Sequence, residues 1–203
     1  LVPYTGQSPD GQIGFVNTEK MYERLVNQFS WGGLNDPNIY FDETNTRMVM
    51  NFRNNYSRLA EALLFKGDTT KAIKTLDKCM SEFPRDVVKL SYFAIPIIDL
   101  YYRLNEKEKG NKMLATMMND YLTEYKYLRE YKTSSGLKQN INITGQVLAN
   151  LSRILKINNI EDNSFNYYEE NGKYYAEKNG EVNETDFTTY TLNSFSEQYL
   201  SIQ

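Results

Sequence analysis

Hydrophobic residues recur at helical spacing along most of the chain. In the stretch from 106 to 131, for example, apolar side chains return every three or four residues, as on one face of a helix. The same spacing predicts a mainly α protein made of antiparallel helix pairs. The predicted helices cover residues 18–29, 45–66, 70–82, 88–104, 106–131, 143–157 and 192–202.

Local signals set the expected ends of these helices. Thr18 and Asp42 are predicted N-caps, because their side chains can accept hydrogen bonds from the first free amides. Gly67 should end one helix, and Pro84 should stop the next, since the residue before proline avoids helical geometry. Pro96 lies inside a predicted helix, so we expect a kink there or a helix start just before it.

The last part of the chain changes character. Asn171-Gly172 separates two pairs of tyrosines, and Asn179-Gly180 follows soon after. Asn-Gly between alternating residues is a strong hairpin signal, because a type I′ turn needs positive φ at both positions. We therefore predict a small β-hairpin or three-stranded meander, with a solvated acidic loop as the alternative.

Two helices in the middle of the chain match a tetratricopeptide repeat. In this interpretation small residues fill the helix crossing, leucines fill the shared core and a proline ends the second helix. The matching positions are Tyr56, Leu59, Ala60, Leu63, Gly67, Ala72, Leu76 and Pro84. A looser copy follows at Ala94, Ile97, Ile98, Tyr101, Gly110 and Leu114. An unrelated stack of helical hairpins is the alternative.

This pattern predicts three regions. Residues 1–42 form an extended lead-in with one short helix, residues 43–157 form the helical repeat domain, and residues 158–203 form an acidic, Tyr- and Asn-rich tail.

Composition narrows the possible chemistry. The 203 residues contain no histidine and one cysteine, and the net charge is −3. Histidine-based triads and histidine-ligated metal sites are therefore excluded in this chain, and no cofactor, metal or catalytic residue is expected. No concentrated basic stripe points to nucleic acid, and no apolar run is long enough for membrane insertion. A hydrolase that uses two carboxylates is the remaining enzymatic alternative.

Several segments together resemble a bacterial family of polytopic inner-membrane proteins of unknown function. These segments are residues 11–18, Trp31-Gly32, residues 51–56 and residues 76–80. The family is similar to protein O-mannosyltransferases of the lipid-linked-sugar type, and its carboxy-terminal region carries tetratricopeptide-like helices. The resemblance covers about residues 1–157, and the chain begins at Leu1 rather than methionine.

The resemblance implies a piece of a larger protein at the periplasmic face of the bacterial inner membrane. The catalytic part would then lie outside this chain, and the membrane part of the parent protein becomes a candidate partner.

The leading functional hypothesis is a non-catalytic module that binds a protein or peptide. In a helical repeat, the first helix of each pair lines the concave face. Polar and aromatic side chains there could hold an extended peptide. The candidates are Asn54, Ser57, Glu61, Phe65, Tyr92, Asp99, Tyr102 and Arg103.

Glycan binding is the alternative function, because aromatic rings can stack on sugar rings. Trp31, Tyr167 and Tyr174 are the candidates, although Trp31 also suits a core anchor beside a glycine turn. Thr69, in Asp68-Thr69-Thr70, resembles the acceptor of a periplasmic O-glycosylation system. Cys79 is expected to be a buried, inert thiol.

Overall fold

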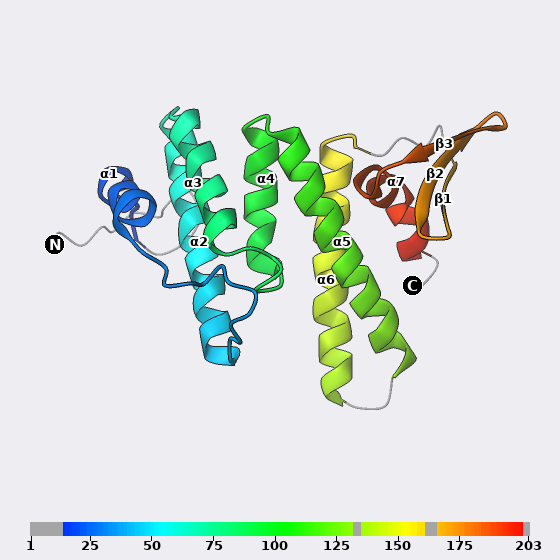
Figure 1. Ribbon diagram of the computed structural model, residues 1–203, viewed down its shortest axis with the longest axis horizontal. Helices are drawn as coiled ribbons and strands as arrows, with labels where there is room; N and C mark the ends of the chain where they lie inside the picture. The colour runs from blue at the N-terminus through cyan, green and yellow to red at the C-terminus, as the bar shows by residue number, and fades with distance from the viewer. Residues whose placement is uncertain (1–13, 132–134, 161–165, 201–203) are drawn as a thin grey trace. The chain divides into compact units, whose positions relative to one another are not determined.

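The computed structural model describes residues 14–131, 135–160 and 166–200 (Figure 1). Within these ranges it holds seven α-helices and one three-stranded antiparallel sheet, so the prediction of a mainly α protein is confirmed. The chain divides into two compact units, Leu1–Asn105 and Glu106–Gln203, which are described separately. The first 13 residues of the predicted lead-in lie outside the described residues.

Unit 1 starts with helix α1 (Thr18–Tyr22), which continues directly as a π-helix, η1 (Glu23–Gln28). Thr18 was predicted to cap the helix, and this is wrong. The Asn17 side chain accepts the capping hydrogen bond from the Lys20 amide at 3.1 Å, while Thr18 is the first helical residue and is buried. In η1 the Phe29 amide donates to the Arg24 carbonyl at 2.8 Å, one residue further back than in an α-helix.

Helices α2 (Glu43–Phe65) and α3 (Thr69–Glu82) form the central hairpin of unit 1 and lie side by side in Figure 1. Asp42 caps α2 as predicted and accepts from the Asn45 amide at 2.8 Å. Gly67, with φ of +81°, takes the left-handed conformation that lets the chain reverse after α2. α3 ends at Glu82, two residues before Pro84.

The core of this hairpin uses the positions that the repeat pattern predicted. Leu59, Ala60, Leu63, Ala72 and Leu76 are all at most 4% exposed. The two alanines let the helices approach each other, and each buried leucine contributes about 1.5–3 kcal/mol relative to an exposed one.

Arg53 fixes the segment that follows α3. Its side chain is fully buried and donates to the carbonyls of Phe83 at 2.8 Å, Val88 at 2.6 Å and Lys89 at 3.0 Å, with a longer contact to Pro84 at 3.4 Å. Burial lowers the pKa of Arg53. Carbonyl oxygens therefore solvate the buried cation in place of water.

The helix predicted over residues 88–104 begins later than expected. The structure has a loop, then a short 3₁₀ helix, η2 (Tyr92–Ala94), then α4 (Ile95–Arg103). The reason lies in Arg53, because the carbonyls of Val88 and Lys89 accept from its guanidinium. Pro96 stands in the first turn of α4, where its missing amide costs no helical hydrogen bond, so the alternative of a start just before Pro96 is confirmed.

Unit 2 contains the long helices α5 (Lys107–Glu130) and α6 (Ser135–Ile157), which pack together through a core that includes Leu114, Met117, Met118, Leu148 and Leu151. α6 begins at Ser135, before the predicted start at residue 143, and the half-buried Leu137 and Ile141 extend its apolar row. The boundary between the units falls between α4 and α5, the two helices of the predicted second repeat.

The predicted meander is confirmed in unit 2. Strands β1 (Asn166–Glu170), β2 (Lys173–Lys178) and β3 (Glu181–Thr185) pair in that order, and helix α7 (Phe187–Leu200) contacts β1 and β2. Both turns have the expected positive φ values: 53° and 75° at Asn171-Gly172, and 54° and 83° at Asn179-Gly180. Among the described residues, no helix combines the length and the apolar character needed to cross a membrane.

Candidate functional site

Part of the predicted peptide face is assembled in unit 1, where α4 packs on α2. Arg103 of α4 lies between two predicted acids: its Nη1 is 3.1 Å from Glu61 Oε1 of α2 and 3.6 Å from Asp99 Oδ2 of α4. All three side chains are partly exposed. α2 and α4 are the first helices of the two predicted repeats. They therefore share a polar surface on which Arg103 lies beside both Glu61 and Asp99.

The aromatic candidates differ in their exposure. Phe65, at the end of α2, is 79% exposed, and Tyr92 is 55% exposed. Tyr102 and Asn54 are half-buried, and burial raises the pKa of the Tyr102 hydroxyl. Ser57 is only 3% exposed, so its assignment to a peptide-contacting surface is corrected.

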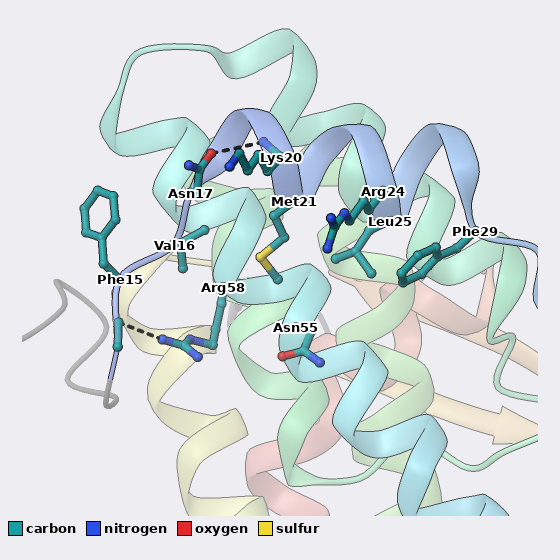
Figure 2. Close-up of a pocket in the computed structure, with 11 residues that line it drawn as sticks. Phe15, Val16, Asn17, Lys20, Met21, Arg24, Leu25, Phe29, Asn55 and Arg58 are labelled. Atoms are coloured by element: carbon teal, nitrogen blue, oxygen red, sulfur yellow. Dashed lines mark hydrogen bonds between the residues drawn. The ribbon is translucent and has the colours of Figure 1, made fainter. Parts of the chain in front are cut away.

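A second site, which the sequence did not indicate, is a hollow of about 390 Å³ between α1–η1 and α2 (Figure 2). The chain before α1 closes one side of it. Its apolar lining comes from the chain before α1 and from α1–η1 with the adjoining Phe29, and Figure 2 shows Met21 and Leu25 pointing from α1 and η1 toward α2. The lining residues are Gly14, Phe15, Val16, Asn17, Lys20, Met21, Arg24, Leu25, Phe29, Asn55 and Arg58.

The charge of this hollow has one sign. Lys20, Arg24 and Arg58 line it, and no acidic residue is among its lining residues. Arg58 also donates from Nη2 to the Gly14 carbonyl at 3.3 Å, which ties the incoming chain to α2. The arrangement combines an apolar floor with cationic groups, and this favours an anion that carries an apolar part.

The π-helix helps to shape this hollow. Its Leu25 carbonyl accepts from the buried Tyr56 hydroxyl of α2 at 2.6 Å, which fixes η1 on α2. Within η1, Glu23 accepts from Asn27 at 2.7 Å and from Gln28 at 3.1 Å. π-helical turns occur often at functional sites, because the extra residue re-aims the side chains that follow.

Another hollow, of about 500 Å³, lies along α1 and the start of α3 and has mixed charge. Asp68 pairs with Lys71 at 2.9 Å, and Lys66 donates to Thr18 Oγ1 at 2.8 Å. These groups are already paired with one another, so this hollow does not favour a ligand of one particular charge.

Trp31 lies in an aromatic cluster. Its ring centroid is 4.7 Å from Phe52, 4.9 Å from Phe83, 5.7 Å from Phe29 and 6.1 Å from Tyr56. These neighbours occupy the sides of the indole that a sugar would need. The geometry thus favours the alternative of a core anchor for Trp31.

The tyrosine pairs of unit 2 also contact one another. Tyr168 stacks on Tyr175 at 5.4 Å, and Tyr174 stacks on Tyr190 of α7 at 4.7 Å. Tyr174 lines a hollow of about 180 Å³ together with Asn119, Lys126, Glu169 and Thr191, among others, whereas Tyr167 is half-buried and pairs with Ala176 in the sheet. Tyr174 therefore has polar groups beside it in a hollow, and Tyr167 belongs to the paired sheet.

Thr69 and Cys79 have contrasting environments. Thr69 is exposed in the first turn of α3, after the capping residue Asp68. Cys79 is fully buried, as expected, and burial raises the pKa of its thiol to about 12. A thiol with this pKa is a poor nucleophile at neutral pH.

Within the described residues, no group of histidine, cysteine and acidic side chains is placed to hold a metal ion. The two carboxyl groups with clear shifts, Asp68 and Asp186, both have lowered pKa values, because hydrogen bonds from Lys71 and Thr189, respectively, stabilise their charged forms. A general acid needs the opposite shift.

Comparison of the chain with protein families, with curated proteins and with solved structures gives no match.

The cationic hollow had one signal in the sequence. Lys20 and Arg24 are four residues apart, and so are the adjoining Met21 and Leu25, so a helix places cations beside an apolar row. The contribution of α2 could not be found this way, because Asn55 and Arg58 reach the hollow only through the tertiary fold.

Proposed function

We propose that the chain is a non-catalytic interaction module that binds an extended peptide on the surface shared by α2 and α4. The observation that supports this most directly is the position of Arg103 between Glu61 and Asp99. This contact joins α4 to α2. Together with Asn54 and Phe65 of α2, Tyr102 of α4 and Tyr92 of the adjoining η2, these three residues make up the α2–α4 face.

This face offers two kinds of contact to a peptide. Carboxylates and a guanidinium can exchange hydrogen bonds with backbone amides and carbonyls, and exposed rings such as Phe65 can bury against side chains of the peptide. Because Arg103 already neutralises part of the charge of Glu61 and Asp99, the face suits a peptide with few charges. The family resemblance implies that the partner would be the membrane part of the same parent protein or another periplasmic chain.

Peptide display on phage tests the proposal, with the purified chain as bait. Enriched peptides should bind the Phe65→Ser and Arg103→Gln variants about tenfold more weakly or worse, since each substitution removes one contact. Tyr40→Ser and Arg47→Gln are matched controls, because Tyr40 is 90% exposed and Arg47 is exposed on α2, and neither belongs to the α2–α4 face. Equal binding by all four variants would place the peptide site elsewhere, and a display without enrichment would contradict the peptide-binding function.

Glycan binding stays a second proposal, and it is supported only by Tyr174 and the polar groups around its hollow. One face of Tyr174 already stacks on Tyr190, so a sugar would have to use the ring edge or the opposite face. A glycan array in which Tyr174→Ala loses every hit would support it, and an array without hits would exclude it.

A further inference from the structure

We infer that the hollow between α1–η1 and α2 is a separate binding site for a small carboxylate with an apolar chain. This site is independent of the proposed α2–α4 face, because the two share no residue. Its volume, about 390 Å³, lies in the usual range for small-molecule pockets.

The apolar part of the ligand has a defined place. Val16 and Leu25 form the buried floor, Met21 is half-buried, and Phe29 is 48% exposed at the rim. A ligand chain against these groups would remove exposed apolar surface from water, which is the main source of affinity for such ligands. Methionine adapts its shape to different chains, so the floor tolerates variation in chain length.

The carboxylate is favoured by the lining charges. Lys20 and Arg24 project from successive turns of α1–η1, and in the described part of the chain neither side chain has an ion-pair partner. Figure 2 shows the Arg24 guanidinium on the α2 side of its helix. Arginine and lysine both bind carboxylates, and hydrogen bonds between charged groups are the stronger ones.

Two nearby acids do not line the hollow. Glu19 and Glu23 line two neighbouring hollows, one of them together with Lys20 and Arg24, and Glu23 accepts hydrogen bonds from Asn27 and Gln28. The net lining charge is therefore positive, and a cationic or neutral ligand of the same size would be disfavoured or would bind more weakly.

Trp31 supplies a built-in reporter. It is the only tryptophan of the chain, and its ring is 5.7 Å from Phe29, which lines the hollow. A ligand that displaces water from Phe29 should change the fluorescence of Trp31. The methyl group of Met21 gives a second, local signal by ¹³C NMR.

The experiment titrates the full chain with octanoate, octanol, octylamine and acetate. Octanoate should shift both the Trp31 fluorescence and the Met21 methyl signal in a saturable way. Octanol and acetate each lack one of the two recognised groups and should bind at least about tenfold more weakly, and octylamine should not bind. The same titration with a short peptide that ends in a leucine carboxylate distinguishes two sources of the carboxylate. Binding of the peptide would indicate the C-terminus of a protein chain, and binding of octanoate alone would indicate a free acid.

Two variants test the site itself. Arg24→Gln keeps a polar side chain but removes the charge, so octanoate binding should weaken about tenfold, because one charge-assisted hydrogen bond is lost. Arg47→Gln, which changes an exposed arginine of α2 outside the hollow, should bind like the wild-type chain. Equal affinity for octanoate and octylamine, an unchanged Arg24→Gln, or no saturable Met21 signal would each overturn the inference.

Discussion

The loop of residues 83–91 in unit 1 and the β-sheet of unit 2 are both non-helical, yet they are stabilised differently. The loop depends on Arg53, which lies 30 to 36 residues earlier in the chain and reaches three carbonyls at 3.0 Å or less. The sheet pairs strands that follow one another directly, through two Asn-Gly turns.

The conformation of the loop is therefore fixed by a side chain that is distant in sequence, whereas the conformation of the sheet is fixed by its own local sequence. A change at one buried residue of α2 should disturb the loop from far away. A change at a turn should disturb the sheet alone.

The largest expected effect is that of Arg53→Met. The substitution removes the guanidinium that donates to the carbonyls of Phe83, Val88 and Lys89. Buried carbonyls without partners are costly, so the free energy of unfolding should fall by about 3 kcal/mol or more. Urea unfolding followed by Trp31 fluorescence measures this in unit 1. Arg47→Met on the exposed side of the same helix should change little. A loss below about 1 kcal/mol for Arg53→Met would show that the loop holds without it.

A smaller effect, on the pH dependence of stability, should come from Cys79. Burial raises the pKa of its thiol from 9.0 to about 12, so the folded chain keeps a proton that the unfolded chain releases. Stability from this group is complete below pH 9 and is lost as the pH rises toward 12.

Wild-type protein should therefore lose about 1 kcal/mol more than Cys79→Ala between neutral pH and about pH 10. Urea unfolding at a series of pH values measures the difference between the two chains, which cancels the titration of other groups. Parallel curves would contradict the buried thiol.

The most local effect should follow from Gly172→Val in the first turn of the sheet. A branched residue at φ of 75° costs about 1–2 kcal/mol, and this loss should stay within the β1–β2 hairpin. Amide hydrogen exchange in β1 and β2 should become faster, while the Trp31 transition of unit 1 keeps its midpoint. Gly172→Asn is the matched control, because asparagine tolerates positive φ. A shift of the Trp31 transition would show that the sheet also supports unit 1.

The elements that could be predicted were those with local signals. The α2–α3 hairpin followed from its apolar spacing, from Asp42, Gly67 and Pro84, and the meander followed from Asn-Gly pairs. The late start of α4 could not be predicted, because it depends on hydrogen bonds from Arg53 to carbonyls that are distant in sequence. The π-helical turn also had no local signal, since its position depends partly on the Tyr56 hydroxyl.

The candidate sites divide in the same way. Glu61, Asp99 and Arg103 were predicted for one surface from helical register, and α2 and α4 bring them together. Ser57 was misplaced, because helical register gives the direction of a side chain but not the neighbour that covers it. The cationic hollow needs three chain segments at once, so its residues become visible as a group only in the fold.

The buried Arg53 also determines where the chain can be lengthened. A loop that must bring the carbonyls of Phe83, Val88 and Lys89 to one guanidinium has little freedom in length, so residues inserted between 83 and 88 would pull these oxygens away from their donor. The turn at Asn179-Gly180 is exposed and bound only by its own strands. An affinity tag or fluorescent label therefore belongs at Asn179-Gly180, outside every residue proposed here to bind a ligand.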